Sequence, residues 1–289
     1  MVTYFTDSDT DMTPELCREY GFRMISMPYS IDGQTIYPYE DFEVFDAHDY
    51  YEKMRHGALP TTSAISEQRY IDYFEPEFAA GNDILYVHFS AAMTNTFDFM
   101  HQALEKLKAK YPERKFYEVD TKGITLLSLN VVMSVGDLLK QGKTPDEIVE
   151  WAKTEVDRHA VYFTVDDLSF FHRSGRVGGL SAVMGTLVGI RPILSMKENG
   201  KMESVDKAKG QKKAIAYLAD KVMELGDDVK NHRIMIGHSD APEMVESLKR
   251  ELRARLGDDI DLPVYAVNPT AGAHCGPNCI GVTFHAIHR

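Results

Sequence analysis

The sequence has few cysteines and no long apolar run. Its three cysteines, Cys17, Cys275 and Cys279, are too few and odd in number for a disulfide framework, so we expect reduced thiols and a cytoplasmic protein. The best candidate for a membrane span, Ala182–Ile190, has nine residues, whereas a spanning helix needs about 20. Met1–Asp7 lacks the basic and apolar segments of a signal peptide, so we expect no secretion by that route.

Positive charge is also scarce. Lys and Arg total 32 and Asp and Glu total 44, which gives a formal net charge of −12. An acidic chain lacks the basic surface typical of nucleic-acid-binding proteins, and it has no overall attraction to anionic membranes. We therefore expect no nucleic-acid partner. The strand–helix junction at Ser90–Phe97 has no glycine-rich phosphate fingerprint, so no dinucleotide cofactor is indicated.

The 289 residues are 44% apolar and 26% charged, which is typical of a globular protein of about two domains. Strand and helix patterns alternate, and this alternation predicts an α/β protein built from βαβ units. Ile84–Phe89 is almost continuously apolar, as strands of a buried parallel sheet are, and the helix Asn95–Lys110 follows it. We place the domain boundary near residue 158.

The other predicted elements follow from local patterns. Asp32 and Gly33 predict a hairpin turn. Strands are expected at Val2–Phe5, Phe22–Pro28, Lys115–Val119, His159–Thr164, Arg191–Met196, Met202–Lys207, Arg233–Gly237, Leu262–Val267 and Gly281–His285. Helices are expected from Thr13 onward and at Asp49–Arg55, Glu67–Phe78, Leu126–Gln141, Thr144–Arg158, Asp167–Arg173, Leu180–Leu187, Gln211–Leu225 and Pro242–Leu256.

Polar segments follow several of the predicted strands. Thr6–Asp9 and Ser90–Phe97 come where parallel strands end, and ligands of open α/β sheets bind at that edge. Pro60–Ser63 contains three hydroxyls, which can bind a carboxylate or phosphate without bringing charge. Each segment has an alternative interpretation, because Asp, Ser, Thr and Asn also cap helices.

Two further segments carry possible functional groups. In Arg173–Gly179, an arginine could clamp a carboxylate, although a helix end with two solvated arginines is the default interpretation of such a run. In Gly272–Cys279, the residues His274, Cys275 and Cys279 could form a zinc site or a cysteine–histidine nucleophile, but both cysteines could also be small buried apolar residues. We expect His274 to lie in a loop and face a site.

Together, and in this order, these segments resemble the DegV family of bacterial fatty-acid-binding proteins. The resemblance extends over essentially the whole chain. It rests on Thr6-Asp7-Ser8, Thr62-Ser63, Ser90–Phe97, Asp120-Thr121, Asp166–Leu168 leading to Gly175-Arg176-Val177, Arg191–Leu194, Lys207–Lys213 and Gly272–Gly281. Each segment is short, and their joint order carries the specificity.

The resemblance implies an N-terminal Rossmann-like domain with a parallel sheet (1–158) and a C-terminal α/β domain with a mixed sheet (159–289). It implies a long-chain fatty acid between them, with its tail in the C-terminal domain. The head group would lie on the hydroxyls of Thr62 and Thr94, with Ser63 and Asn95 adjacent and with Arg176 and His274 nearby. The implied protein has no cofactor and is not itself an enzyme. A fatty acid kinase phosphorylates the bound carboxylate for phospholipid synthesis, and delivery needs transient membrane contact.

Some positions depart from the family pattern. Thr94 replaces a serine, Asn95 a glycine, Phe97 a tyrosine, Cys275 a threonine and Asn278 a glycine.

Burial of about a dozen methylenes at about 0.8 kcal/mol each gives roughly 10 kcal/mol, so the tail should dominate affinity and the head should fix orientation.

Three interpretations remain beside the lipid carrier and its head-group site. Leu180–Leu194 is a candidate wall for the tail, or plain core. The cluster Lys207, Lys209, Lys212 and Lys213 is a candidate membrane contact, or a solvated helix start. The competing hypothesis for the whole protein is a hydrolase or zinc-binding protein that uses His274, Cys275 and Cys279.

Overall fold

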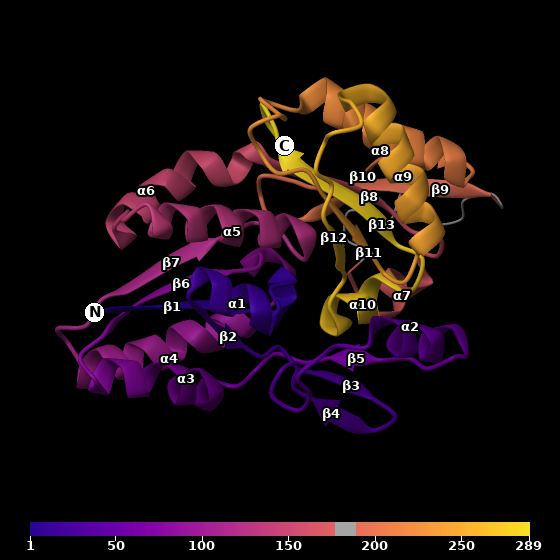
Figure 1. Ribbon diagram of the computed structural model, residues 1–289. Helices are drawn as coiled ribbons and strands as arrows, with labels where there is room; N and C mark the ends of the chain where they lie inside the picture. The colour runs from indigo at the N-terminus through magenta and orange to yellow at the C-terminus, as the bar shows by residue number, and fades with distance from the viewer. Residues whose placement is uncertain (177–188) are drawn as a thin grey trace.

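The computed structural model describes residues 1–176 and 189–289, and this part of the chain is built around two large β-sheets (Figure 1). The first sheet has four parallel strands in the order β2-β1-β6-β7. These strands are β1 (Val2–Asp7), β2 (Phe22–Ile25), β6 (Asp83–His88) and β7 (Phe116–Asp120). Their carboxyl ends share one edge, and the polar segments after β1 and β6 therefore meet there.

Helices cover both faces of the parallel sheet. Ile84 and Tyr86 of β6 pack on one face, and Leu85 and Val87 pack on the other. Because successive side chains point to opposite faces, a strand covered on both sides is apolar throughout, as the sequence predicts for this one. The helices are α3 (Glu67–Ala79) and α4 (Thr96–Lys110) on the first face and α1 (Pro14–Tyr20), α5 (Leu126–Lys140) and α6 (Pro145–Glu155) on the second.

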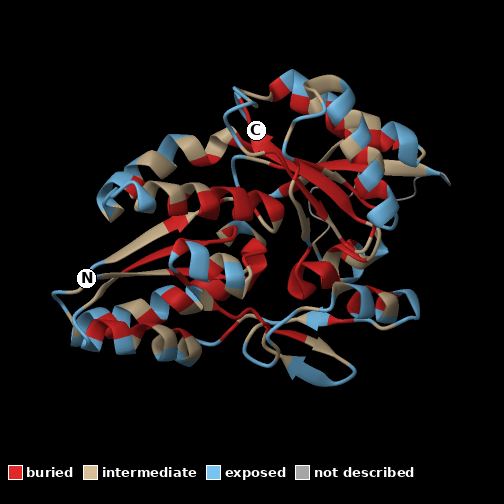
Figure 2. Cartoon of the chain, in the orientation of Figure 1, coloured by how far each residue is buried: buried red, intermediate tan, exposed pale blue. Residues whose placement is uncertain are grey.

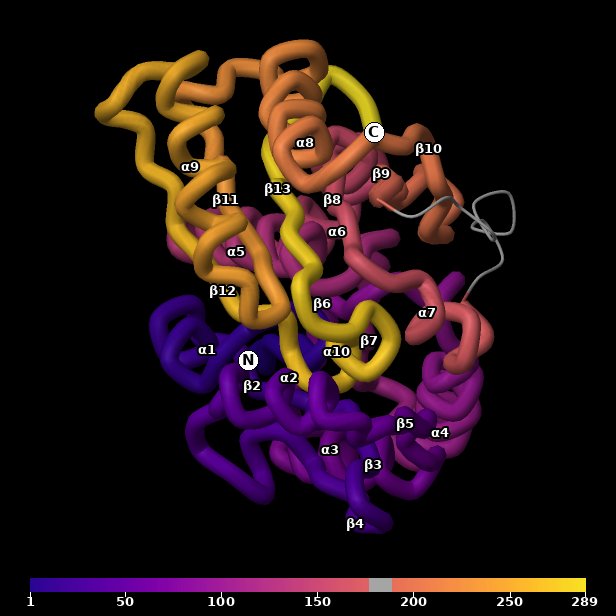
Figure 3. The backbone as a smooth tube through the Cα atoms, turned by 90° about the vertical axis from the view of Figure 1, so that its right-hand side faces the viewer, coloured from indigo at the N-terminus to yellow at the C-terminus, as the bar shows by residue number. Residues whose placement is uncertain are grey.

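The second sheet is mixed and has six strands in the order β10-β9-β8-β13-β11-β12. Only the β11–β12 pair of this sheet is parallel. Figure 3 shows β13 between β8 and β11. The strands are β8 (His159–Thr164), β9 (Ile190–Met196), β10 (Met202–Lys209), β11 (Met235–His238), β12 (Val264–Ala266) and β13 (Ile280–His285).

The two faces of the mixed sheet have different neighbours. α8 (Gln211–Leu225) and α9 (Pro242–Leu256) cover one face, where Tyr162 and Phe284 join the core. On the other face, Val161 joins a separate cluster with Leu127 of α5. Ten of the fifteen residues of α5 are buried, because this helix packs against both sheets (Figure 2).

A small third sheet and three short helices lie beside the gap between the large sheets (Figure 1). The sheet has the order β4-β3-β5, and Asp32 and Gly33 form the predicted hairpin turn with positive φ angles. Its strands are β3 (Tyr29–Ile31), β4 (Gln34–Ile36) and β5 (Thr61–Thr62), and the short helices are α2 (Ala47–Arg55), α7 (Ser169–Arg173) and α10 (Pro269–Cys275). Of the described helices, none has the length and apolar character to cross a membrane.

The α/β fold with a parallel sheet followed by a mixed sheet is confirmed. The predicted strand Phe22–Pro28 ends earlier, at Ile25, and the sequence interpretation missed β5 and α10. The predicted helix Leu180–Leu187 and most of the candidate tail wall lie outside the described residues. The boundary near residue 158 stays a prediction, although it coincides with the start of β8.

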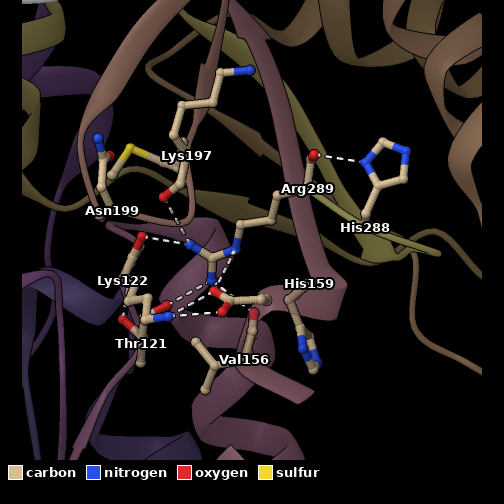
Figure 4. A network of polar contacts seen from close by, with 12 residues as sticks. Thr121, Lys122, Val156, His159, Lys197, Asn199, His288 and Arg289 are labelled. Atoms are coloured by element: carbon tan, nitrogen blue, oxygen red, sulfur yellow. Dashed lines mark hydrogen bonds and ion pairs between the residues drawn. The ribbon is translucent and has the colours of Figure 1, made fainter. Parts of the chain in front are cut away.

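Arg289 joins segments that are distant in the sequence (Figure 4). Its guanidinium donates to the carbonyls of Thr121 and Val156 at 2.8 and 2.7 Å. It also donates to the carbonyl of Lys122 at 2.7 Å, and more weakly to that of Lys197 at 3.4 Å. One buried side chain therefore ties the loop after β7 to the loop between β9 and β10.

Candidate functional site

A cavity of about 230 Å³ lies between the two large sheets. The carboxyl-terminal edge of the parallel sheet and the third sheet give it polar residues, whereas the mixed sheet gives it apolar residues such as Val161, Phe163 and Met196. All six residues predicted for the head-group site line this one cavity: Thr62, Ser63, Thr94, Asn95, Arg176 and His274. The fold therefore brings together side chains that are up to 212 positions apart.

α10 carries His274 to the cavity wall, and its start is fixed by Asn268. The Asn268 side chain accepts from the backbone N–H of Ala271 at 2.9 Å, and Pro269 occupies the first helical turn. Asp11 in turn accepts from both the backbone and the side-chain amide of Asn268, at 3.0 and 2.8 Å. This cap means that His274 lies on a helix, which corrects the expectation of a loop.

Two tyrosines of α2 hold the other side of α10. Tyr50 donates to the Pro269 carbonyl at 2.7 Å, and Tyr51 donates to the Val267 carbonyl at 2.9 Å. Gly272 lets the helix approach Tyr51 closely, because a Cβ at this position would lie 2.5 Å from the tyrosine oxygen. α10 is thus positioned by the N-terminal half of the chain.

His274 and Thr62 form the central polar contact of the cavity. The His274 Nε2 atom lies 3.0 Å from the Thr62 hydroxyl oxygen. Burial and the nearby Arg176 and Arg173 charges lower the pKa of His274 to about 4, so the imidazole is neutral at pH 7. If Nε2–H donates to Thr62, the Thr62 hydroxyl proton is available to an acceptor in the cavity.

The junction between β6 and α4 supplies two further residues. The Thr94 hydroxyl oxygen accepts from the backbone N–H of Thr96 at 3.1 Å, so capping and a free hydroxyl proton coexist in one side chain. Asn95 occupies the cap position of α4, and no capping bond from its side chain is found among the described residues. Ser63 is exposed and lines the same cavity.

Arg176 lies just beyond the end of α7. Gly175 has a φ of 73°, and the Arg176 guanidinium donates to the Ser174 carbonyl at 2.8 Å. The segment therefore forms the end of α7, as one interpretation of the sequence expects, and Arg176 also lines the cavity, as the other interpretation requires. Its half-buried position leaves a positive charge beside His274.

The two cysteines lie on the apolar side of the cavity. Cys275 and Cys279 are both buried free thiols, and the neighbouring Cys275 thiol together with burial raises the pKa of Cys279. Within residues 1–176 and 189–289, the one group with metal-binding spacing is His48, Glu52 and Asp240, which is distinct from His274 and the cysteines. Arg55 already pairs with both carboxylates of that group.

The main cavity residue outside the predicted set is Asp9. It follows Asp7, whose carboxylate caps the short helix η1 (Ser8–Thr10) by accepting from the Asp9 N–H at 3.0 Å. Asp9 itself is 5% exposed and lines the cavity. The polar segment Thr6–Asp9 therefore both caps a helix and lines a site. Because Asp9 follows the first parallel strand, its position in the sequence could have predicted that it lines the cavity.

These features define an α/β protein with two large sheets and, between them, a cavity that is polar on one side and apolar on the other. The chain belongs to the DegV family, because the family model, described as uncharacterised proteins of the DegV family, matches residues 2–286. A DegV domain-containing protein from Clostridium perfringens is 30% identical over 280 residues, covering 97% of this chain and 96% of that protein.

Solved structures give the same result for the fold. The fatty-acid-binding DegV family protein from Thermus thermophilus has a TM-score of 0.87 and 25% identity, with 99% of both chains covered. A DegV family protein from Ruminococcus gnavus, described with vaccenic acid, has a TM-score of 0.83 and 20% identity, with 98% of this chain and 99% of that chain covered. The whole described fold is therefore that of the family.

Proposed function

We propose that this protein binds a long-chain fatty acid in the cavity, with the carboxylate on the polar side and the acyl chain among the apolar residues. The observation that carries the proposal is the cavity itself. One continuous cavity joins hydroxyls and an imidazole to apolar side chains from the mixed sheet. The fatty-acid-binding relative from Thermus thermophilus supports the same ligand class.

The head group needs hydrogen-bond donors, because a carboxylate removed from water is costly unless it is paired. No residue of 1–176 or 189–289 accepts the Thr94 hydroxyl proton, and the Thr62 proton is available to a ligand when His274 donates to Thr62. Arg176 adds a positive charge and its remaining N–H donors. Ser63 and Asn95 complete the polar side of the proposed site.

The tail needs only apolar surface. Val161, Phe163, Phe171, Met196 and Met202 line the cavity and come from the mixed sheet and α7. At about 0.8 kcal/mol per buried methylene, this contact favours long chains over short ones. We assign the tail to residues of 159–289 and the head mainly to residues of 1–158.

The proposed protein is a carrier without catalytic residues or a cofactor of its own. Its partner is a fatty acid kinase that phosphorylates the presented carboxylate to an acyl phosphate for phospholipid synthesis. Loading and delivery need brief membrane contact, for which the exposed lysines 207, 209, 212 and 213 are candidates. The carrier role predicts that kinase, ATP and fatty acid give acyl phosphate only when this protein is added.

The alternative, a hydrolase or zinc-binding protein, receives less support. His274 and Cys275 are neighbours on α10, so their side chains diverge. The neighbouring Cys275 thiol and burial both raise the pKa of Cys279, and this disfavours the thiolate that nucleophiles and zinc sites need. Elemental analysis of the purified protein distinguishes the two hypotheses, since the carrier predicts no stoichiometric zinc.

Native mass spectrometry tests the carrier directly. Protein purified from cells should carry an added mass of one long acyl chain, and hexadecanoate added to delipidated protein should raise its melting temperature. The proposal fails if the purified protein is free of lipid and hexadecanoate leaves the melting temperature unchanged.

A further inference from the structure

Asp9 presents a buried carboxyl group to the cavity and has unused hydrogen-bonding capacity. Its Oδ1 atom has no partner among the described residues. Asp7 accepts from the Phe89 and Asp9 N–H groups, and Asp11 accepts from Asn268 through Oδ1. The Asp11 Oδ2 atom also lacks a described partner, but of these three residues only Asp9 lines the cavity. An unpartnered carboxyl on a cavity wall points to a ligand group as its missing partner.

The Asp9 carbonyl accepts from the Thr125 N–H at 2.8 Å, so the start of α5 fixes the backbone of Asp9, and α10 lies beside its side chain. Thr270 lies near Asp9, and it precedes His274 by four residues, which places both on one face of α10. The Thr270 proton is used on the Met27 carbonyl at 2.8 Å, so it is not available to Asp9. Thr270 lies about one helical turn, roughly 5 Å, from His274 along α10, and Asp9, Thr270, Thr62 and His274 all line the same cavity.

The charges around Asp9 favour a proton on it. Burial raises the pKa of Asp9 well above its ordinary value, and the flanking Asp7 and Asp11 act in the same direction. Arg176 acts in the opposite direction, and His274 is neutral at pH 7. The first two turns of α5 (126–133) carry no ionisable side chain, although the positive end of this helix faces the cavity beside Thr125.

The positive groups at the cavity are thus sufficient to stabilise about one negative charge. Arg176 and the start of α5 can stabilise one carboxylate, but a bound fatty acid beside an ionised Asp9 would place two like charges in a site of low dielectric constant. Two carboxyl groups in such a position share a single proton, and that proton then forms a hydrogen bond between them.

We propose that Asp9 is a further head-group residue, which keeps a proton when the fatty acid is bound and donates it to the carboxylate of the fatty acid. This inference rests on the proposed function and adds a specificity rule to it. The site then selects an acyl chain with one ionised carboxyl group, and it weakens when Asp9 ionises.

The test measures the affinity for hexadecanoate between about pH 6 and pH 9. Wild-type affinity should fall with rising pH by up to about tenfold per pH unit, because binding then requires the uptake of one proton. Asp9→Asn keeps an N–H donor, so its affinity for hexadecanoate should not change with pH. Asp9→Ala lacks a donor and should bind hexadecanoate about 10- to 100-fold more weakly than the wild type at pH 7. Hexadecan-1-ol carries no charge and should give a flat profile with the wild type.

Asp11→Asn is the matched control for a neighbouring titration. It retains an oxygen that can accept from Asn268, and it should keep the alkaline loss of affinity. The loss should begin at lower pH, because removal of one negative neighbour lowers the pKa of Asp9. An alkaline loss that persists in Asp9→Asn, or that is equal for hexadecan-1-ol, overturns the proposal. Hexadecanoate that binds the wild type at no pH overturns the proposed function itself.

A second measurement uses the wild-type protein and does not depend on the folding of a variant. The infrared difference spectrum of the hexadecanoate complex should show the carbonyl stretch of a protonated carboxyl group. Isotope labelling of the hexadecanoate carboxyl carbon should leave this band in place, since the proton then belongs to a carboxyl group of the protein and not to the fatty acid. A band that shifts with the label assigns the proton to the fatty acid and contradicts the role of Asp9.

Discussion

Thr94 uses its hydroxyl oxygen inside the protein and keeps its hydroxyl proton for the cavity. Thr94→Val removes this group at nearly constant volume, so affinity for hexadecanoate should fall by about 1.5–3 kcal/mol, or about 10- to 100-fold. Calorimetric titration measures the change. Thr94→Ser keeps the hydroxyl and should bind within a few-fold of the wild type. Equal affinity in the valine variant contradicts the role of Thr94.

Asp11 makes the free energy of unfolding decrease as the pH rises. Burial raises its pKa from 3.8 to about 7, so between these values the folded state binds more protons than the unfolded state. The contribution of Asp11 to the free energy of unfolding therefore falls as the pH rises through this window and stays low above it. Asp11→Asn should remove this fall, which amounts to at most about 4 kcal/mol. Urea unfolding at several pH values checks it, and parallel wild-type and variant curves contradict it.

The contact between α10 and α2 depends on Gly272. A Cβ at this position would clash with the Tyr51 hydroxyl, so Gly272→Ala should destabilise the fold by about 1–3 kcal/mol. Tyr51→Phe removes the oxygen and should recover part of this loss in the double variant, although it also frees the Val267 carbonyl. Thermal unfolding of all four proteins measures the coupling. Simple additivity of the two changes would show that the two residues do not clash.

Elements with strong local signals were predictable, and those made by tertiary contacts were not. The start of α6 is marked by a capping box between Thr144 and Glu147. The strand β6 is predictable from its continuous run of apolar residues. β5 has two residues and exists through its pairing with β3. α10 has only seven residues, and Pro269 and Gly272 within it are residues that a helix prediction counts against. Asn268 followed by Pro269 is nevertheless the pattern of a helix N-cap and first turn, and it could have predicted the start of α10.

Polar contacts connect the two halves of the chain at several places distant from α10. Ser90 donates to the Gly200 carbonyl at 2.7 Å, and Arg289 donates to backbone carbonyls on both sides. Arg289→Met should leave these buried carbonyls unpaired and lower the free energy of unfolding by about 2–4 kcal/mol. The hexadecanoate affinity of the folded variant should stay close to that of the wild type, since Arg289 is not on the cavity wall. Chemical unfolding checks the first expectation, and an unchanged midpoint contradicts it.

The alternation of strand and helix patterns predicts an α/β protein, because strand and helix periodicity are local properties. The two-domain arrangement and the six cavity residues follow from the resemblance to the DegV family, which rests on the order of the motifs along the chain. The sequence does not predict the contacts that assemble the cavity. The hydrogen bond between Thr62 and His274 depends on where α10 is anchored, and that depends on Tyr50, Tyr51 and Asp11 together. The unpaired carboxyl of Asp9 is likewise visible only after folding.

A crystal structure of the protein with hexadecanoate tests the central claim most directly. The account predicts one tube of electron density in the cavity, with the carboxylate within hydrogen-bond distance of Thr62 and Thr94 and the chain running toward Met196 and Met202. A cavity whose apolar side is filled by protein side chains, or a chain bound in the opposite direction with its carboxylate beside Cys279, would contradict it.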